Sequence, residues 1–298
     1  MRTRPTLTWE PTGDPLPAST DLTAVVEAVR GGGVAVLSGA GLSTESGIPD
    51  YRGEHGSLRR RHTPMTYEEF VGDPQARQRY WARSQLGWRA MTRAVPNTGH
   101  RAVTALAEAG HVIGVITQNV DGLHQAAGAR DVIELHGSLS RVICLTCGDL
   151  SDRAELDRRL REANPEFEAD AARHRAARVN PDGDVELPPE AVRAFRVVPC
   201  TVCGTGVLKP DVVFFGENVP PERVERCRRL VAGATTLLVL GSSLTVMSGL
   251  RFVRQAARSG VPVLIINQGP TRGDRWADQR VERPLGEALT EIVARTRA

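Results

Sequence analysis

The chain has 298 residues, of which 41% are hydrophobic and only 4% aromatic, and it contains 29 glycines. A chain of this length can bury one large core with an added smaller module, which excludes a peptide-sized or wholly unfolded protein. Few aromatic residues and many glycines favour an α/β arrangement over an aromatic-rich β sandwich.

Charge and hydropathy narrow the class of protein further. The formal net charge is only +3, and basic residues are interleaved with acidic ones, so nucleic acid is not the favoured partner. No apolar run is long enough to cross a bilayer, so we expect no membrane partner. Residues 1–19 contain arginines and four prolines but no apolar core of a secretory signal, and we expect a flexible terminus. We expect a cytoplasmic protein, and the near absence of lysine, with Lys209 as the single exception, favours a bacterial source.

In chain order, a helix predicted over Thr20–Arg30 precedes the first of four buried strands. Each strand is a short apolar run that ends in a polar or glycine-containing loop. The four runs are Val34–Leu37, Val112–Ile116, Thr236–Leu240 and Val263–Ile266. Helical patterns between them supply the crossovers that a parallel sheet requires, at His100–Ala109, Glu222–Ala232 and Leu250–Ser259. The sequence predicts an α/β fold, a Rossmann-like parallel sheet with helices on both faces, whose loops meet at one ligand crevice.

Two stretches break this alternation of strands and helices. Residues 52–97 contain Tyr80, Trp81 and Trp88 among charged residues, and residues 139–208 contain four of the five cysteines. We interpret both as insertions that form a smaller domain, with a helical part and a cysteine module. The larger dinucleotide-binding domain then comprises residues 20–51, 98–138 and 209–298.

The four cysteines form two pairs with metal-ligand spacing, and a glycine follows each pair. The pairs are Cys144 with Cys147 and Cys200 with Cys203. Such knuckles bring four thiolates to one tetrahedral Zn²⁺ at about 2.3 Å, and four sulfur ligands leave no open position for catalysis. The alternatives are two disulfides, which a cytoplasmic chain disfavours, and redox pairs, which usually begin a helix. We predict one structural zinc ion, with the charged helical stretch 151–177 and the Pro181–Asp184 turn between the pairs bulging outward.

The loop after the first strand carries a glycine pattern. Gly39-Ala40-Gly41 resembles a dinucleotide-binding turn, but Thr44 replaces the third glycine of G-x-G-x-x-G, so the motif alone is weak. A tight strand-to-helix turn is the alternative. Glycines allow backbone N–H groups to meet a pyrophosphate, and Asp50 and Arg52 add opposite charges to a loop that contains a proline.

Six motifs in one order resemble the signature of the sirtuin family. They are Gly39–Ser43 with Gly47–Arg52, Thr117–His124, Glu134–Gly137, the two cysteine pairs, Lys209–Glu217 and Gly241–Leu244. The resemblance covers about residues 20–290. Tyr51 in place of the commoner phenylalanine, together with residues 75–83, 181–185 and 269–272, is similar to the class II branch of this family.

The resemblance implies NAD as a co-substrate and identifies residues that would bind it. The pyrophosphate and the nearby ribose would contact Gly39, Ala40, Gly41 and Thr44, and the adjoining loop would contribute Asp50, Tyr51 and Arg52. The adenosine half would be lined by Gly241, Ser242, Ser243, Asn267, Gln268, Gly269 and Leu285. Gln118, Asn119 and Asp121 would face the nicotinamide ribose and carboxamide. Outside this context, Asp121 is an ordinary turn residue and Asn119 a cap at a strand end.

The resemblance also implies a protein-lysine deacylase with His136, Asn119 and Asp121 as catalytic residues. A lone histidine is more often structural, but His136 follows the apolar segment 132–135 and precedes Gly137, which places it on a loop at the crevice. Because imidazole titrates near neutrality, His136 can accept a proton from a ribose hydroxyl as general base. In the family's reaction the acyl oxygen of the modified lysine attacks C1′ of the ribose and nicotinamide departs. The products are free lysine, nicotinamide and O-acyl-ADP-ribose.

Acyl-lysine side chains of proteins are the implied partner. Val213, Phe215 and Gly216 belong to an extended apolar segment, which by itself is typical of a buried strand. The family pairs such a segment with a strand-like stretch, here Val246-Met247, and holds the substrate backbone between the two. Tyr51 would shield the nicotinamide site.

Two other functions stay open on the sequence. A mono-ADP-ribosyltransferase would use the same scaffold with a protein nucleophile in place of the acyl oxygen. A non-catalytic NAD- or ADP-ribose-binding module is disfavoured because the three catalytic residues are intact. Residues 56–59 lack the tyrosine of the Tyr-x-x-Arg pair that marks removal of acidic acyl groups, which disfavours succinyl and malonyl chains, although Arg59, Arg60 and Arg61 keep them open. Acetyl, longer acyl and lipoyl chains are all compatible with the sequence.

Overall fold

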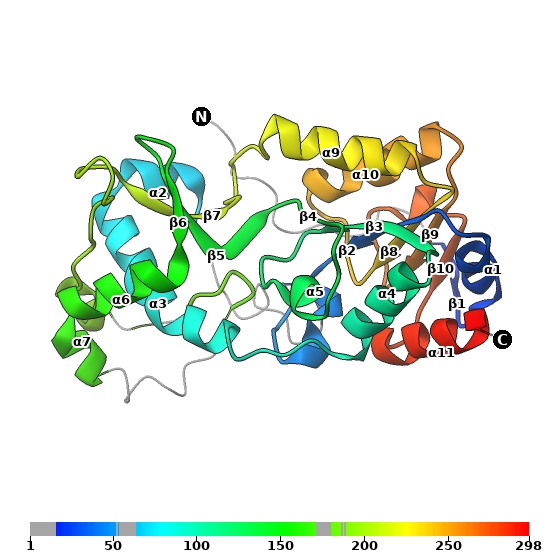
Figure 1. Cartoon of the computed structure of the whole chain (residues 1–298), viewed down its shortest axis with the longest axis horizontal. Coiled ribbons are helices and arrows are strands. Elements are labelled where there is room, and N and C mark those ends of the chain that lie inside the picture. Colours follow the sequence, from blue (N-terminus) through cyan, green and yellow to red (C-terminus); the bar gives the residue numbers. More distant parts are fainter. Residues whose placement is uncertain are drawn as a thin grey trace.

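The computed structural model describes residues 16–51, 53, 64–170, 180–185, 187 and 189–297. A seven-stranded sheet and a three-stranded sheet lie beside each other along the long axis of the molecule (Figure 1). The predictions made for residues 1–15, for Arg52, for residues 56–61 and for residues 171–177 fall outside the described residues.

All strands of the larger sheet run parallel, as the sequence predicts, in the order β1-β10-β9-β8-β2-β3-β4. They are β1 (Ala18–Ser19), β2 (Val34–Ser38), β3 (Val112–Thr117), β4 (Val132–Glu134), β8 (Thr236–Leu240), β9 (Val263–Ile266) and β10 (Gln279–Val281). The four predicted strands are confirmed. The prediction of a flexible terminus up to residue 19 is wrong at its end, because Ala18 and Ser19 pair with β10 and close one edge of the sheet.

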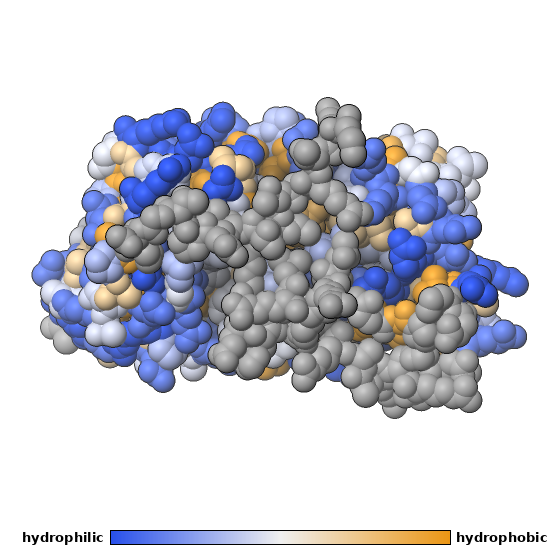
Figure 2. Space-filling view, turned by 180° about the vertical axis from the view of Figure 1, so that it is seen from behind, coloured by the Kyte–Doolittle hydropathy of each residue, from blue (hydrophilic) through white to orange (hydrophobic). Residues whose placement is uncertain are grey.

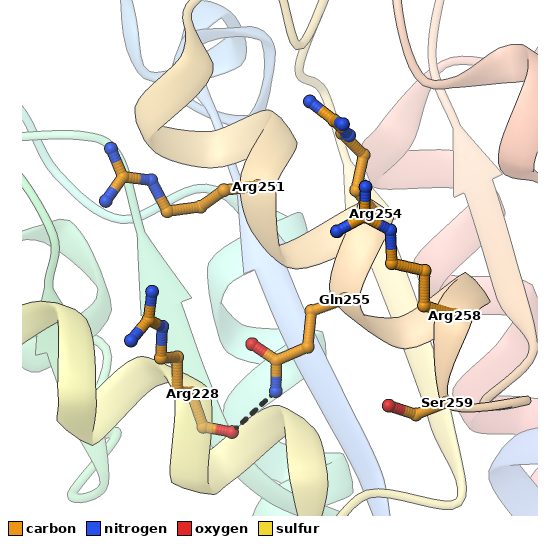
Figure 3. A pocket seen from close by; sticks show the side chains of 6 residues that line it. All are labelled: Arg228, Arg251, Arg254, Gln255, Arg258 and Ser259. Carbon is orange, nitrogen blue, oxygen red and sulfur yellow. Dashed lines mark hydrogen bonds between the residues drawn. The ribbon is translucent and has the colours of Figure 1, made fainter.

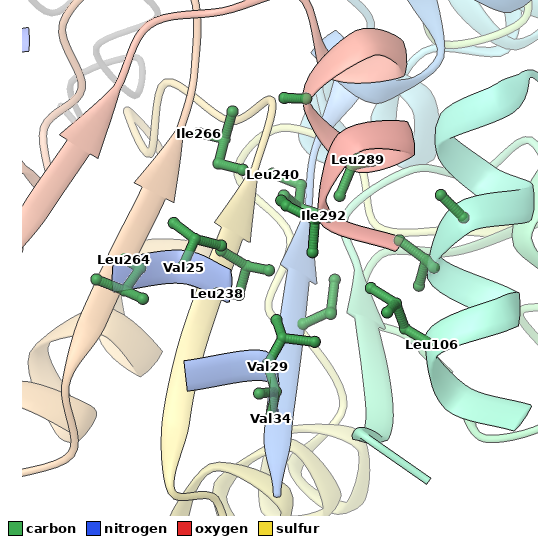
Figure 4. Packing of buried hydrophobic residues seen from close by; sticks show 14 of the residues in the cluster. Val25, Val29, Val34, Leu106, Leu238, Leu240, Leu264, Ile266, Leu289 and Ile292 are labelled. Carbon is green, nitrogen blue, oxygen red and sulfur yellow. The ribbon is translucent and has the colours of Figure 1, made fainter. Parts of the chain in front are cut away.

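Helices cover both faces of this sheet, because each central strand buries both of its sides. The helices are α1 (Thr23–Gly31), α4 (Thr98–Glu108) and α11 (Leu285–Arg297) on one face, and α9 (Pro221–Ala232) and α10 (Met247–Arg258) on the other. In β2, Val34 and Val36 face the first group while Ala35 and Leu37 face the second. Figure 4 shows Leu289 and Ile292 of α11 near Leu240 of β8 and Ile266 of β9, in the same hydrophobic cluster. Continuous apolar strands therefore mark the centre of a doubly covered sheet.

Asn97, at the start of α4, connects this helix to the loop that follows β2. Asn97 caps the helix by accepting a hydrogen bond from the His100 N–H at 3.1 Å, and its own amide donates to the Leu42 carbonyl at 2.7 Å. Leu42 ends η1 (Ala40–Leu42), the turn that follows β2 and precedes η2 (Thr44–Ser46). The loop of residues 39–46, called the glycine loop below, is thereby hydrogen-bonded to the start of α4.

The smaller sheet is antiparallel, with the order β6-β5-β7, and five of the described helices pack into one hydrophobic cluster with it. The strands are β5 (Gly137–Cys144), β6 (Leu150–Asp152) and β7 (Leu208–Val212). The helices are α2 (Tyr67–Gly72), α3 (Pro74–Met91), α6 (Arg153–Ala163), α7 (Pro165–Asp170) and α8 (Pro189–Arg193). The predicted domain boundary at residue 209 therefore falls inside β7. The described residues also contain two other short elements, α5 (Leu123–Ala126) and η5 (Asp274–Trp276).

The Pro181–Asp184 turn lies against α3 and does not bulge outward, so that prediction is wrong. Arg83 of α3 forms an ion pair with Asp184 at 3.2 Å and donates to the Val185 carbonyl at 2.7 Å. A Cβ on Gly87 would lie 2.4 Å from the Gly183 carbonyl oxygen, so the close approach requires glycine in the helix. The turn therefore belongs to the core of the smaller domain.

One face of the molecule shows mostly hydrophilic side chains among the described residues that are visible on it (Figure 2). On the face in Figure 2, hydrophilic residues predominate and hydrophobic residues appear in small patches. Within the described ranges, no helix combines the length and apolarity that a membrane span needs.

Two histidines are buried beneath the edge of the larger sheet where β2 and β3 end. His100 and His124 are 0% and 1% exposed, their rings meet edge to face at 5.1 Å, and His124 Nε2 lies 2.9 Å from Ser38 Oγ. Burial, aided by the charge of Arg101, lowers the pKa of His100 to about 4. Burial lowers the pKa of His124 to about 3. Both imidazoles are neutral in the folded protein at neutral pH.

These histidines predict how stability depends on pH. Because their folded pKa values lie below 6.5, the unfolded chain binds more protons between pH 6.5 and their folded values. Above pH 6.5 the two neutral histidines do not reduce the free energy of unfolding. As the pH falls from 6.5 toward 4, the free energy of unfolding decreases by up to about 1.4 kcal/mol per histidine and pH unit. Urea unfolding at several pH values should show wild type losing more stability than His124→Asn on acidification. Equal losses in both would contradict this account.

Candidate functional site

The loops that follow β2 and β8 meet at the carboxyl edge of the larger sheet. Gly39 N–H donates to the Leu240 carbonyl and Gly41 N–H to the Gly241 carbonyl, both at 2.9 Å. A Cβ on Gly41 would lie 2.9 Å from Gly241 Cα, and a Cβ on Gly241, whose φ is +60°, would lie 2.6 Å from the Leu42 nitrogen. Only glycine allows these two backbones to approach so closely.

Residues predicted to bind the adenosine half lie together around this contact. A Cβ on Gly241 would lie 2.8 Å from Leu285 Cδ1, so the start of α11 lies against the loop. Asn267 donates from its amide to the carbonyls of Gln268 and Gly269, both at 2.9 Å, which shapes the turn after β9. Ser242 and Ser243 follow Gly241 directly at the end of β8. The loops after β2, β8 and β9 therefore lie close together at the edge where the sequence predicts the ligand site.

Gln118 connects three strand ends. Its backbone N–H donates to the Ser38 carbonyl at 3.0 Å, and its side-chain amide donates to Ser242 Oγ at 2.8 Å. Its own carbonyl accepts a hydrogen bond from His136. A Cβ on Gly249 would lie 2.5 Å from Gln118 Oε1, so α10 approaches this side chain closely. One residue thereby fixes the ends of β2, β3 and β8 relative to His136.

Asn119 and Asp121 both contact Ser43 in the glycine loop. The Asn119 amide donates to the Gly39 carbonyl and to Ser43 Oγ, each at 3.0 Å. Ser43 Oγ donates to Asp121 Oδ2 at 2.7 Å, and the Leu123 N–H donates to Asp121 Oδ1 at 2.9 Å. Burial raises the pKa of the Asp121 carboxyl, although these two hydrogen bonds oppose the shift. The carboxyl is held in one orientation.

His136 is held by two hydrogen bonds that define its tautomer. Nδ1 lies 2.9 Å from the Gln118 carbonyl oxygen, and Nε2 lies 2.8 Å from Ser248 Oγ. A carbonyl oxygen can only accept, so Nδ1 carries the proton and Nε2 presents its lone pair. Ser248 then donates to Nε2. The ring is in the form that can accept a proton at Nε2.

The surroundings of His136 disfavour its charged form. Burial lowers its pKa to about 4, and the charges of Arg223 and Arg251 act in the same direction, while the hydrogen bond to the Gln118 carbonyl opposes them. At neutral pH the ring is therefore available as a base.

Val213, Phe215 and Gly216 lie directly after β7 on one side of His136. The Val213 N–H donates to the His136 carbonyl at 2.8 Å, so this segment is fixed beside the histidine. The Phe215 ring meets the Tyr51 ring edge to face at 6.1 Å. Two residues predicted for different roles, Tyr51 and Phe215, are thus brought together.

The single lysine shapes this segment from inside the protein. Lys209 is 2% exposed, donates to the carbonyls of Pro210 and Val212 at 3.2 and 2.5 Å, and pairs with Glu217 at 3.0 Å. The Glu217 carboxylate in turn accepts from the Phe214 N–H at 2.8 Å. A buried ammonium is costly unless paired, so these bonds explain its location.

Val246 and Met247 directly precede Ser248, which contacts His136, but the prediction of a strand-like stretch is wrong. Val246 is the N-cap residue of α10, and Met247 is the first residue of that helix, with 41% exposure. Ser248, which sequence reasoning did not select, lies in the first turn and reaches His136. Its position next to the predicted substrate residues was the only signal in the sequence.

Two other predicted residues make local contacts within the described part of the chain. Thr44 Oγ1 donates to the Gly41 carbonyl at 2.9 Å, and Asp50 Oδ1 accepts from the Gly53 N–H at 2.9 Å. Glu45, which the sequence did not indicate, accepts from the Gly286 N–H at 2.9 Å and joins the glycine loop to α11.

The four predicted cysteines form one cluster in the smaller domain. All their sulfur atoms lie within 4.8 Å of one another, with Cys144 and Cys203 at 3.7 Å and Cys147 and Cys200 at 3.8 Å. A tetrahedral zinc site with sulfur at about 2.3 Å has sulfur–sulfur edges of about 3.8 Å, so the donors fit. A Cβ on Gly206 would lie 2.2 Å from the Cys144 sulfur, which leaves room there only for glycine. N–H groups of Cys147 and Thr146 lower the pKa of the Cys144 thiol to about 6.

Comparison with known proteins gives a family and close relatives. The model of the Sir2 family matches residues 39–248. The chain is 67% identical to "NAD-dependent protein deacetylase 1" of Streptomyces coelicolor, over 99% of this chain and 96% of that protein. It is 51% identical to the protein of the same name from Mycobacterium avium, over 91% of this chain and 93% of that protein.

Solved structures show the same fold. One described as "Structural Basis for the Mechanism and Regulation of Sir2 Enzymes" has a TM-score of 0.68 and 31% identity, over 93% of this chain and 97% of that chain. Another, described as "Sir2-p53 peptide-NAD+", has a TM-score of 0.70 and 26% identity, over 92% of this chain and 98% of that chain. Together with the parallel sheet and the cysteine cluster, these matches show that the chain belongs to the Sir2 family.

Proposed function

We propose that this chain is an NAD-dependent protein-lysine deacylase that releases nicotinamide and O-acyl-ADP-ribose. The observation that carries the proposal is the state of His136. Its ring is neutral, and its Nε2 accepts a hydrogen bond from Ser248. The residue is connected through Gln118 to the ends of β2 and β8, and through its backbone carbonyl to the segment 213–216. The names of the Streptomyces coelicolor and Mycobacterium avium relatives support the same chemistry.

The crevice at the strand ends would hold the dinucleotide. Residues 39–41 and Thr44 of the glycine loop would face the pyrophosphate, and the turns after β8 and β9 with Leu285 would face the adenosine. Gln118, Asn119 and Asp121 would orient the nicotinamide ribose, because Ser43 and the strand ends fix their side chains. NAD, when bound, supplies an electrophilic ribose carbon with nicotinamide as leaving group. A structure described as "Sir2-p53 peptide-NAD+" supports this assignment.

His136 would accept the proton of a ribose hydroxyl at Nε2. The Gln118 carbonyl keeps the proton on Nδ1 and prevents the other tautomer, which would present a donor to the hydroxyl. In the absence of substrate, the Ser248 hydroxyl donates a hydrogen bond to Nε2, and the ribose hydroxyl would take the place of Ser248 as the donor. The substrate backbone would lie between residues 213–216 and the start of α10 at Val246-Met247, with Tyr51 and Phe215 excluding water.

The cysteine cluster would hold one structural zinc ion that stabilises the smaller domain. We propose the two-domain division predicted above, with the boundaries moved so that β5 and β7 belong to the smaller domain. A cytoplasmic location and the class II branch remain part of the proposal and rest on the sequence pattern.

Replacement of His136 tests the assignment of the base. His136→Ala should lower kcat for NAD-dependent deacylation of an acetyl-lysine peptide by about 10²- to 10⁴-fold, because general base catalysis contributes that much. The wild-type kcat/KM should fall as pH drops through about 4, since the protonated ring cannot act as base. Full activity of His136→Ala would contradict the role. Isothermal titration of NAD should show that the variant still binds it.

Replacement of Ser248 tests its effect on the base. Ser248→Ala removes a hydrogen bond that favours the neutral ring, so the pKa of His136 should rise and the acid limb of kcat/KM should move to higher pH. Ser248→Thr keeps the hydroxyl and should restore the wild-type profile. An activity loss of equal size at every pH would indicate a purely structural contribution instead.

Removal of a cysteine tests the zinc site. Cys147→Ser should reduce bound zinc from one ion per chain and lower the thermal midpoint, measured by atomic emission and calorimetry. Cys227→Ala is the matched control, because Cys227 is buried in α9 and burial raises the pKa of its thiol to about 12. The control should retain one zinc ion. Zinc loss in both variants, or in neither, would argue against the cluster as the site.

A further inference from the structure

Four arginine side chains line a hollow between α9 and α10, the two helices that cover one face of the larger sheet (Figure 3). Arg228 comes from α9, and Arg251, Arg254 and Arg258 come from α10, with Gln255 and Ser259 completing the lining. The hollow has a volume of about 450 Å³. The Gln255 amide donates to the Arg228 carbonyl at 2.9 Å, which fixes the two helices at its floor.

These arginines carry little compensating charge. Among the described residues, the carboxylate within ion-pairing distance of the four is that of Glu225, 3.9 Å from Arg228. Arg141, in contrast, contacts two carboxylates at 2.9 and 3.0 Å. Four cations in one hollow exceed the net charge of +3 of the whole chain, so the hollow is a local source of positive potential.

The hollow begins beside the proposed substrate cleft. Arg251 lies one helical turn after Ser248, whose hydroxyl is 2.8 Å from Nε2 of His136. The Arg251 Nε donates to the Met247 carbonyl at 3.4 Å, so its side chain lies over the first turn of α10. The Arg251 charge also acts on the His136 ring. Of the three lining arginines on α10, Arg251 is therefore the one nearest to Ser248 along the helix.

Resting on the proposed function, we propose that this hollow binds aspartate and glutamate residues that flank the acyl-lysine in substrate proteins. A peptide held against the start of α10 has to leave the cleft over neighbouring surface, and α10 presents three of the four arginines along its exposed side. Guanidinium groups bind carboxylates in pairs of hydrogen bonds, and exposed cations steer an acidic segment toward its site. Binding of the substrate backbone beside His136 would accept many peptide sequences. The hollow would then favour those peptides that carry acidic residues next to the acyl-lysine.

Matched peptides test this selection. Three acetyl-lysine peptides would carry three aspartates before the lysine, three after it, or asparagines at the same positions. With the wild-type enzyme, kcat/KM for at least one aspartate peptide should exceed that of the asparagine peptide by about tenfold, through a lower KM. The advantage should shrink as salt concentration rises, because exposed charges are screened.

Charge variants locate the effect. The double variant Arg254→Gln/Arg258→Gln should lose the aspartate advantage and keep wild-type kcat/KM for the asparagine peptide. Arg226→Gln/Arg229→Gln removes the same charge from exposed positions of α9 outside the lining and should keep the advantage. Arg254→Glu/Arg258→Glu should prefer a peptide with arginines at the flanking positions.

Three results would overturn the proposal. One is equal kcat/KM for aspartate and asparagine peptides, and another is an aspartate preference that survives in Arg254→Gln/Arg258→Gln. The third is binding of inorganic polyphosphate to wild type, lost in that double variant, with no peptide preference, which would assign the hollow to a free anion. Failure to deacylate the asparagine peptide would contradict the proposed deacylase function and not the hollow.

Discussion

The contact between the backbones of Gly41 and Gly241 is the constraint on which the site depends. It joins the loops after β2 and β8 at the carboxyl edge of a parallel sheet, where neither position has room for a Cβ. With these loops joined, Ser43 can reach Asn119 and Asp121, and Gln118 can reach Ser242. A parallel sheet brings these loops to one edge, and glycine allows them to touch.

Burial of polar groups at this edge then determines their chemistry. Taking histidines out of water keeps them neutral, and a carbonyl at one ring nitrogen directs the lone pair of the other toward the crevice, as Gln118 does for His136. Arg223 and Arg251 reinforce the neutral state. Desolvation and one backbone hydrogen bond thus keep the His136 imidazole neutral, with the proton on Nδ1.

Sequence predicts those features that local pattern encodes. The central strands are found because both their faces are buried and their apolar runs are continuous, and the cysteine cluster is found from spacing and following glycines. Strands β1 and β10 are too short to show a period. The start of α10 has no side-chain cap, so nothing local marks Met247 as helical. The approach of Gly183 to Gly87 joins distant segments that no local pattern relates.

The most direct test of the central claim is the stoichiometry of products, measured by mass spectrometry on purified protein with NAD and an acetyl-lysine peptide. The account predicts one nicotinamide and one O-acetyl-ADP-ribose for each peptide deacylated. ADP-ribose attached to protein, with the peptide still acetylated, would contradict it and assign the transfer of ADP-ribose to a protein nucleophile. Absence of NAD turnover by folded, zinc-loaded protein would contradict it as well and leave a binding module.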